Sequence, residues 1–69
     1  MAKDEIETWL KSKLTGQINS AKLAMNKLTI NLDQCDWRAV GETHREIDYF
    51  LSRCKNTQRL IDELDEVTK

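Results

Sequence analysis

The sequence has few of the residues that interrupt or cross-link a small fold. Its 69 residues include no proline, two glycines, two cysteines and one histidine, and only 6% are aromatic. With 33% charged residues and a formal net charge of −1, this composition is typical of one small all-helical unit. No apolar run is long enough to span a membrane, and residues 1–5 lack the apolar core of a signal peptide. We therefore expect a soluble, cytoplasmic protein.

The polar segment from Asn31 to Trp37 is the only turn that the pattern indicates. Asp36 is a good N-cap for a second helix, because its carboxylate can accept hydrogen bonds from the free amides of the next turn. Asp33 is a second candidate cap. Such a short loop makes two helices antiparallel neighbours. The expected single domain spans residues 1–69, with a helix at 3–32, a turn at 33–36 and a helix at 37–67.

Both arms carry mostly apolar residues at helical spacing, in steps of three or four. The predicted seam of the first arm consists of Ile6, Leu10, Leu14, Ile18, Ala21, Met25, Leu28 and Leu32. The predicted seam of the second arm consists of Trp37, Val40, His44, Ile47, Leu51, Cys54, Gln58 and Ile61. Because the first seam keeps its phase across Gly16, we expect one continuous helix there despite the cost of an interior glycine.

The two seams fit each other if the chain reverses near residues 34 and 35. Facing positions should then have numbers that add to about 69, so that Ala21, for example, meets Ile47. Apolar residues meet apolar residues nearly throughout. We interpret the exceptions, His44 and Gln58, as partly buried polar residues that fix the register. Trp37 is expected to close the turn end of this core.

The size of the chain predicts self-association. A domain this short leaves much of its apolar surface exposed and often needs a disulfide, a metal or a second subunit. In the hairpin, Cys35 and Cys54 lie about 27 Å apart, whereas a disulfide needs Cα atoms within about 7 Å. We therefore expect free thiols, and we expect the hairpins to associate into a homodimeric or heteromeric four-helix bundle.

Further apolar residues outside the two seams are candidates for contact surfaces. Trp9, Leu23 and Ile30 lie opposite the main seam of the first arm, and we interpret them as the binding strip for a protein partner. On the second arm, apolar residues widen the seam on one flank. The predicted oligomer interface consists of Phe50, Leu60, Leu64, His44 and Gln58.

Charge differs between the arms and leaves two alternatives open. Residues 8–32 contain four lysines and no acid, whereas residues 33–69 contain nine acids and six bases. The lysines would suit a dimeric hairpin that binds RNA, and the acidic arm would suit a mimic of nucleic acid that occupies a basic partner surface. The chain is net acidic and has no arginine cluster, so we do not expect nucleic acid as the partner.

We predict no catalytic site, metal or cofactor. His44 is the one histidine, and Cys54 lies too far along the same helix to share a zinc ion with it. A nucleophile, a base and an orienting group need a concave pocket, and a two-helix hairpin supplies little concavity.

The segment LDQCDWRAV at residues 32–40, followed by Arg45, resembles a helix-loop-helix segment of bacterial flagellar and secretion chaperones. In size the chain is also similar to RNA-binding hairpin dimers that control plasmid copy number. Neither resemblance fixes a function. The function we predict is a small non-catalytic protein-binding module, namely an adaptor, chaperone or regulatory inhibitor that acts through an amphipathic helical surface.

Overall fold

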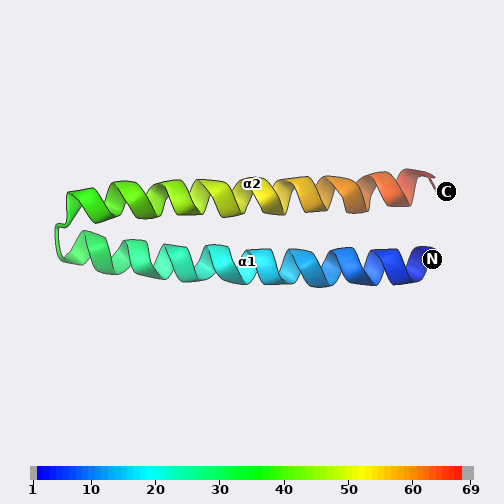
Figure 1. The fold of residues 1–69 in the computed structure, drawn as a ribbon, viewed down its shortest axis with the longest axis horizontal. Helices are drawn as coiled ribbons and strands as arrows, with labels where there is room; N and C mark the ends of the chain where they lie inside the picture. The colour runs from blue at the N-terminus through cyan, green and yellow to red at the C-terminus, as the bar shows by residue number, and fades with distance from the viewer. Residues whose placement is uncertain (1, 68–69) are drawn as a thin grey trace.

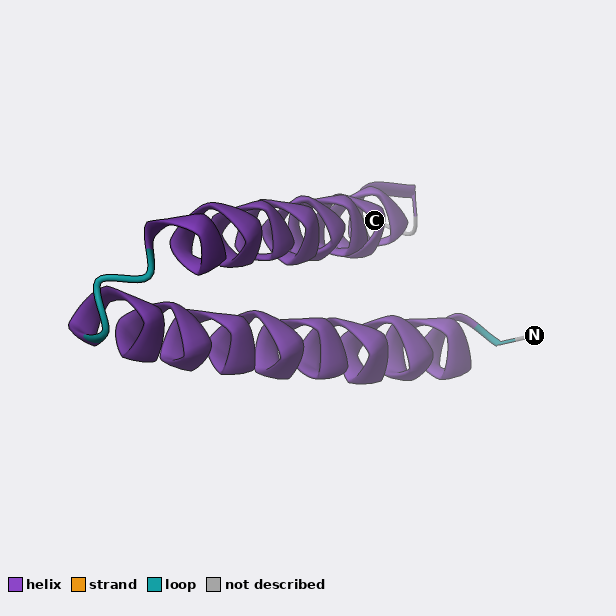
Figure 2. Cartoon of the chain, turned by 60° about the vertical axis from the view of Figure 1, so that its left-hand side comes forward, coloured by secondary structure: helices purple, strands orange, loops and turns teal. Residues whose placement is uncertain are grey.

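A computed structural model describes residues 2–67, which form two long α-helices joined by a turn at residues 34–36 (Figure 1). α1 spans Lys3–Asp33 and α2 spans Trp37–Val67. The helices lie side by side and run in opposite directions, so the first turn of α1 and the last turn of α2 share one end (Figure 1 and Figure 2). The predicted all-α helical hairpin is confirmed. It is a thin rod with principal extents of 50 × 15 × 14 Å.

α1 is a single uninterrupted helix. It has no side-chain cap at its start, but Asp4 and Glu5 lie in its first turn, where carboxylates interact favourably with the helix dipole. As predicted, the helix continues through Gly16. A Cβ atom on Gly16 would meet nothing within 4 Å, so the absence of a side chain there is not what lets α2 approach.

The turn satisfies the free backbone groups of both helix ends. Cys35 adopts a left-handed conformation with φ 54°, and its amide donates to the carbonyl of Leu32 over 3.0 Å. The amide of Asp36 donates to the carbonyl of Asn31 over 3.0 Å, which completes a Schellman motif at the end of α1. The carboxylate of Asp36 then accepts a hydrogen bond from the amide of Ala39 over 3.2 Å. The predicted N-cap of α2 is thus confirmed.

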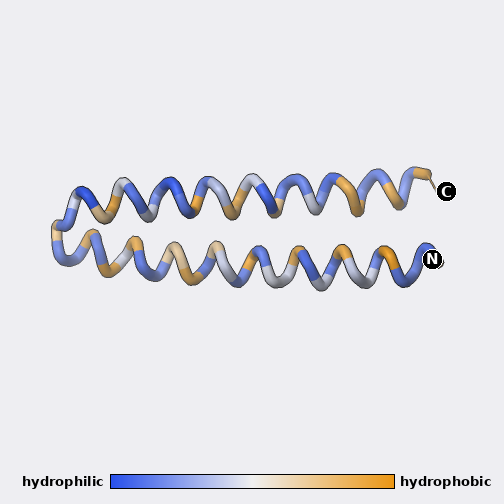
Figure 3. Tube along the Cα trace, viewed as in Figure 1, coloured by the Kyte–Doolittle hydropathy of each residue, from blue (hydrophilic) through white to orange (hydrophobic). Residues whose placement is uncertain are grey.

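The side chains between the helices follow a heptad repeat, with positions a and d facing inward. Both positions are buried or partly buried from residue 10 to residue 31 and from residue 40 to residue 64. Hydrophobic segments recur along both helices, separated by hydrophilic ones (Figure 3). The a positions are Leu14, Ala21, Leu28, Val40, Ile47, Cys54 and Ile61. The d positions are Leu10, Gln17, Ala24, Asn31, Thr43, Phe50, Thr57 and Leu64.

The predicted seams were right in column a and wrong in their second column. Along most of both helices they combined column a with column e, whose side chains the structure leaves exposed. Each helix is turned by about 50° from the predicted phase, half of the 100° step between successive residues, so that column d is buried instead. Trp37 is 67% exposed and does not close the core. The exposed e residues are Ile18, Met25, Leu32, Trp37, His44, Leu51 and Gln58.

Two polar layers explain why column d lies inside. Asn31 Nδ2 donates to Thr43 Oγ1 over 2.9 Å, and Thr57 Oγ1 donates to Gln17 Oε1 over 2.7 Å. Thr43 is only 1% exposed, so its hydroxyl depends on a partner within the protein. The numbers of each pair add to 74 and not to about 69, so the predicted pairing did not bring these polar residues together.

Replacement of Cys35 with glycine should stabilise the protein. A left-handed residue with a Cβ atom costs about 1–2 kcal/mol, and the greater freedom of glycine in the unfolded chain offsets part of that gain. We expect a net gain of about 0.5–1 kcal/mol and a rise in Tm of about 4 °C, measured by thermal circular dichroism. Cys35→Ser is the control, because it removes the thiol and keeps the Cβ atom. Equal Tm values for Cys35→Gly and Cys35→Ser would show that the left-handed conformation of Cys35 does not destabilise the protein.

The pair Asn31 and Thr43 should behave as one unit. Thr43→Val removes the shorter of the two hydrogen bonds of the Asn31 amide and leaves the one to the Ala39 carbonyl at 3.4 Å, and we expect a loss of about 1–3 kcal/mol in the free energy of unfolding. Asn31→Leu combined with Thr43→Val replaces both polar groups and should lose less than the two single variants together. Urea unfolding of the wild type, the two single variants and the double variant, all at the same protein concentration, tests this expectation. Additive losses would show that the two side chains are not coupled.

Candidate functional site

The predicted partner strip lies on the outer side of α1. Trp9, Leu23 and Ile30 are 60%, 70% and 56% exposed, and they share heptad position c, with Gly16 between the first two. The Lys13 ammonium lies 5.0 Å from the centre of the Trp9 ring, which is a cation–π contact. The structure therefore leaves three large apolar side chains on one line of the helix surface.

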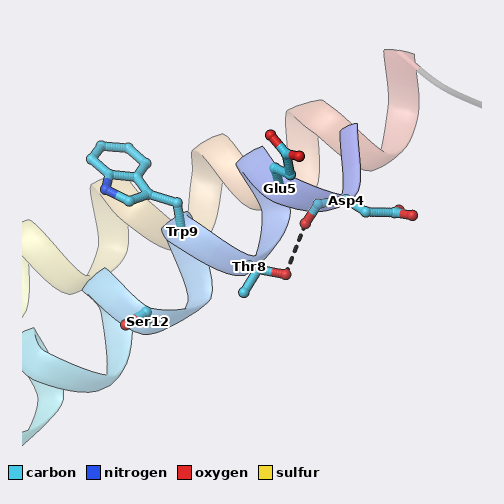
Figure 4. A pocket seen from close by; sticks show the side chains of 5 residues that line it. All are labelled: Asp4, Glu5, Thr8, Trp9 and Ser12. Carbon is cyan, nitrogen blue, oxygen red and sulfur yellow. Dashed lines mark hydrogen bonds between the residues drawn. The ribbon is translucent and has the colours of Figure 1, made fainter. Parts of the chain in front are cut away.

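A hollow next to Trp9 marks the start of this strip (Figure 4). It is lined by residues of the first turns of α1 alone, among them Asp4, Glu5 and Ser12. The Thr8 hydroxyl donates to the carbonyl of Asp4 over 2.8 Å, so it is occupied within its own helix. Because only one helix lines this hollow, it can receive the side chain of a partner but does not enclose a small substrate.

The residues of the predicted oligomer interface do not share one face of the hairpin. Phe50 and Leu64 are d residues, partly buried between the helices. Leu60 is a half-exposed g residue on one side. His44 and Gln58 are e residues on the opposite side, where each contacts its own helix. His44 Nδ1 lies 3.5 Å from an oxygen of Asp48, and Gln58 Nε2 donates to Asp62 Oδ1 over 3.0 Å.

The exposed e residues form a surface that the sequence prediction had assigned to the core. We call this surface the e face: Ile18, Met25, Leu32, Trp37, His44, Leu51 and Gln58. Its apolar members are between 37% and 67% exposed. In an antiparallel pair of helices, e positions neighbour e positions of the other helix, so the two columns run along the same side of the hairpin.

The opposite side of the hairpin, where g positions meet, is polar toward the turn and in its middle, whereas at the open end Ile6, Leu60 and Val67 line an apolar hollow. Toward the turn, Lys27 Nζ lies 3.6 Å from Glu46 Oε1 and joins the two helices. Further along, Lys13 and Arg53 together line another hollow. Arg53 also donates to the Tyr49 hydroxyl over 2.7 Å. The two long sides of the rod therefore differ in chemistry: large apolar side chains recur along the e face, whereas on the g side they lie at the open end.

An ion pair within α1 lies near the open end of the rod and interacts with a carboxylate of α2. Lys11 Nζ lies 2.8 Å from Glu7 Oε1. This hydrogen bond and charge raise the pKa of Lys11 and lower the pKa of Glu7. The carboxylate of Asp65 on α2 adds a smaller rise to the pKa of Lys11. Lys11 and Asp65 are both e residues, so this interaction marks the charged end of the e face.

The four lysines of residues 8–32 do not form one basic surface. Lys11 and Lys27 are in ion pairs, and Lys13 covers the Trp9 ring. In the heptad repeat the four lysines occupy positions e, g, b and g, on different sides of the helix. Acidic residues of α2 are similarly engaged, as Glu63 is with Arg59 at 3.3 Å.

Within residues 2–67, no three or more His, Cys, Asp and Glu side chains are grouped where they could hold a metal ion. Neither of the two described helices contains a stretch that is long and apolar enough to cross a membrane. Cys35 and Cys54 are both free thiols. Comparison with protein-family models, with curated proteins and with solved structures finds no match for this chain.

Proposed function

We propose that this protein is a small non-catalytic protein-binding module that works as a four-helix assembly of two hairpins and offers the strip of Trp9, Leu23 and Ile30 to a protein partner. The observation that carries the proposal is the strip itself. Each of its three side chains is more than half exposed, and all lie on one line of a rigid helix. Exposed apolar lines with an aromatic residue are typical of protein contact sites.

The length and spacing of the strip fit a helical partner. At 1.5 Å per residue, the distance from Trp9 to Ile30 along α1 is about 32 Å, which is the length of a helix of about 20 residues. Spacing by sevens matches the seam of a coiled coil, in which a partner helix presents apolar residues at steps of three and four. The partner we propose is therefore an amphipathic helix of another protein.

The mechanism would be occlusion of the partner's apolar face. An adaptor, a chaperone and a regulatory inhibitor all act by covering such a face. They differ in what the partner protein does when this chain is not bound to it. Occlusion needs no reacting group on this chain. The proposal includes a cytoplasmic location, which the free thiols of Cys35 and Cys54 support, since reducing compartments keep thiols in this state.

Nucleic-acid binding and nucleic-acid mimicry have weaker support. A phosphate-binding surface needs several free cations on one face, whereas two of the four lysines of residues 8–32 are paired with glutamates. A phosphate mimic needs a row of free carboxylates. On α2, Glu42 and Glu63 pair with arginines one turn away, at 3.7 Å and 3.3 Å.

Trp9→Ser combined with Leu23→Ser should abolish partner binding and preserve the fold. Both side chains are exposed, so helicity measured by circular dichroism should be unchanged. Truncation of two anchor residues should weaken binding by at least about tenfold. The measurement is quantitative capture from host lysate by the immobilised protein. It compares the wild type with this variant and with Asn19→Ser combined with Asn26→Ser, which alters exposed residues away from the strip.

The expected result is a protein that the wild type and the asparagine variant capture equally and that the strip variant loses. Its binding segment should be an amphipathic helix, which a synthetic peptide of that segment can establish by direct titration. Equal capture by all three proteins would exclude the strip as the partner site.

A further inference from the structure

We infer that the e face is the dimer interface and that its occupant is a second copy of this chain. This inference rests on the proposed four-helix assembly and identifies the surface that forms it. The predicted interface mixed residues from several sides of the hairpin. The structure shows one continuous alternative, which runs along both helices from the turn toward the open end.

The composition of the e face is that of an interface centre. Its apolar side chains come from both helices, three from α1 and two from α2. At the turn end Leu32 and Trp37 lie close in sequence, and at the open end the column finishes in Lys11 and Asp65. An apolar centre with charged groups at its margin is the usual arrangement of protein interfaces.

Two of the residues that border the e face on α1 can lose water at little cost, whereas Lys22 between them is charged. Thr15 and Thr29 occupy the neighbouring position b. Each hydroxyl donates to the carbonyl four residues earlier, over 3.0 Å to Lys11 and 3.2 Å to Met25. A hydroxyl that is already bonded within its own helix does not become an unsatisfied donor when a partner covers it.

The exposed area of the single hairpin matches what one partner of a dimer should bury. The chain exposes 5321 Å², whereas a compact monomer of 8.1 kDa exposes about 4,500 Å². The excess of about 800 Å² equals the area that each partner buries in a standard interface. The radius of gyration of 15.7 Å also exceeds the value of about 11 Å for a globular chain of this length. A second rod alongside the first would bury an area of this size and make the assembly less elongated for its mass.

The core of the hairpin explains why the occupant should be another copy of the chain. Among the described residues, the buried apolar side chains are Leu10, Ala21, Ala24, Ile47 and Ile61, of which two are alanines. So small a core needs further burial of apolar surface whenever the chain is folded. A second copy of the chain is always present where the chain is made, so it can supply this burial. Apolar residues at a, d and e are also the pattern of helices in four-helix bundles.

The same geometry separates the two surfaces. The partner strip occupies position c of α1, next to the g side, whereas the e face lies on the other side of the rod. A dimer through the e face leaves Trp9 and Leu23 exposed. Self-association and partner binding can therefore be disrupted independently.

Met25→Glu combined with Leu51→Glu should convert the dimer to a monomer. Both residues lie in the middle of the e face, and each copy would bring two charges into an apolar interface. Light scattering over a dilution series should give twice the chain mass for the wild type. The variant should give half that value at the same concentrations, with association weakened at least a hundredfold. The matched control, Leu23→Glu combined with Ile30→Glu, carries the same charges on the partner strip and should remain dimeric.

Tryptophan emission gives a readout that does not depend on how the charged variant folds. Trp9→Phe leaves Trp37 of the e face as the only tryptophan, and Trp37→Phe leaves Trp9 of the strip. On dilution of the dimer, the emission of Trp37 should shift to longer wavelength as it becomes exposed, whereas the emission of Trp9 should not move.

The e face would be excluded if the wild type were monomeric throughout the series or if Trp37 emission stayed constant while the mass halved. It would also be excluded if the strip variant dissociated and the Met25 and Leu51 variant remained dimeric. None of these outcomes bears on partner capture through Trp9 and Leu23. If the protein were monomeric and mutation of the strip still abolished capture, the proposed protein-binding function would hold and only the dimer interface would be excluded.

Discussion

The arrangement of the whole hairpin depends on two buried hydrogen bonds between the helices. The bonds Asn31 to Thr43 and Gln17 to Thr57 join d positions that are polar on both sides. Any other rotation of the helices would leave these groups without partners in a narrow core. Because the polar groups must meet, the larger e side chains are turned outward. The exposed apolar side chains of the e face are thus a consequence of the polar contacts between the helices.

Sequence patterns predicted the helices, the turn and the antiparallel pairing, since these depend on local chemistry such as the Asp36 cap and the absence of proline. They did not predict the rotation of the helices. Column e, with Ile18 and Met25, is more apolar than column d, with Gln17 and Asn31, so hydrophobicity favoured the wrong column. The missed signal was column d itself, where amides of α1 and threonines of α2 are complementary.

The candidate surfaces were predicted unevenly for the same reason. Trp9, Leu23 and Ile30 lie outside in either phase of α1, so their exposure did not depend on the register. The e face could not be recognised without the rotation, because its residues had already been assigned to the core. A sequence with apolar residues at a, at e and at half of its d positions contains enough hydrophobic surface for two interfaces, and only the polar layers specify which interface lies within the chain.

The two polar layers also differ in how far apart their partners lie along the chain. Asn31 and Thr43 are 12 residues apart, whereas Gln17 and Thr57 are 40 apart. Closure of the longer loop from the unfolded chain costs about 1 kcal/mol more in entropy. Once the first layer and the turn have formed, each further pair is brought together by the one before it. The hairpin should therefore fold from the turn outward, and at its open end the contacts form last and open first.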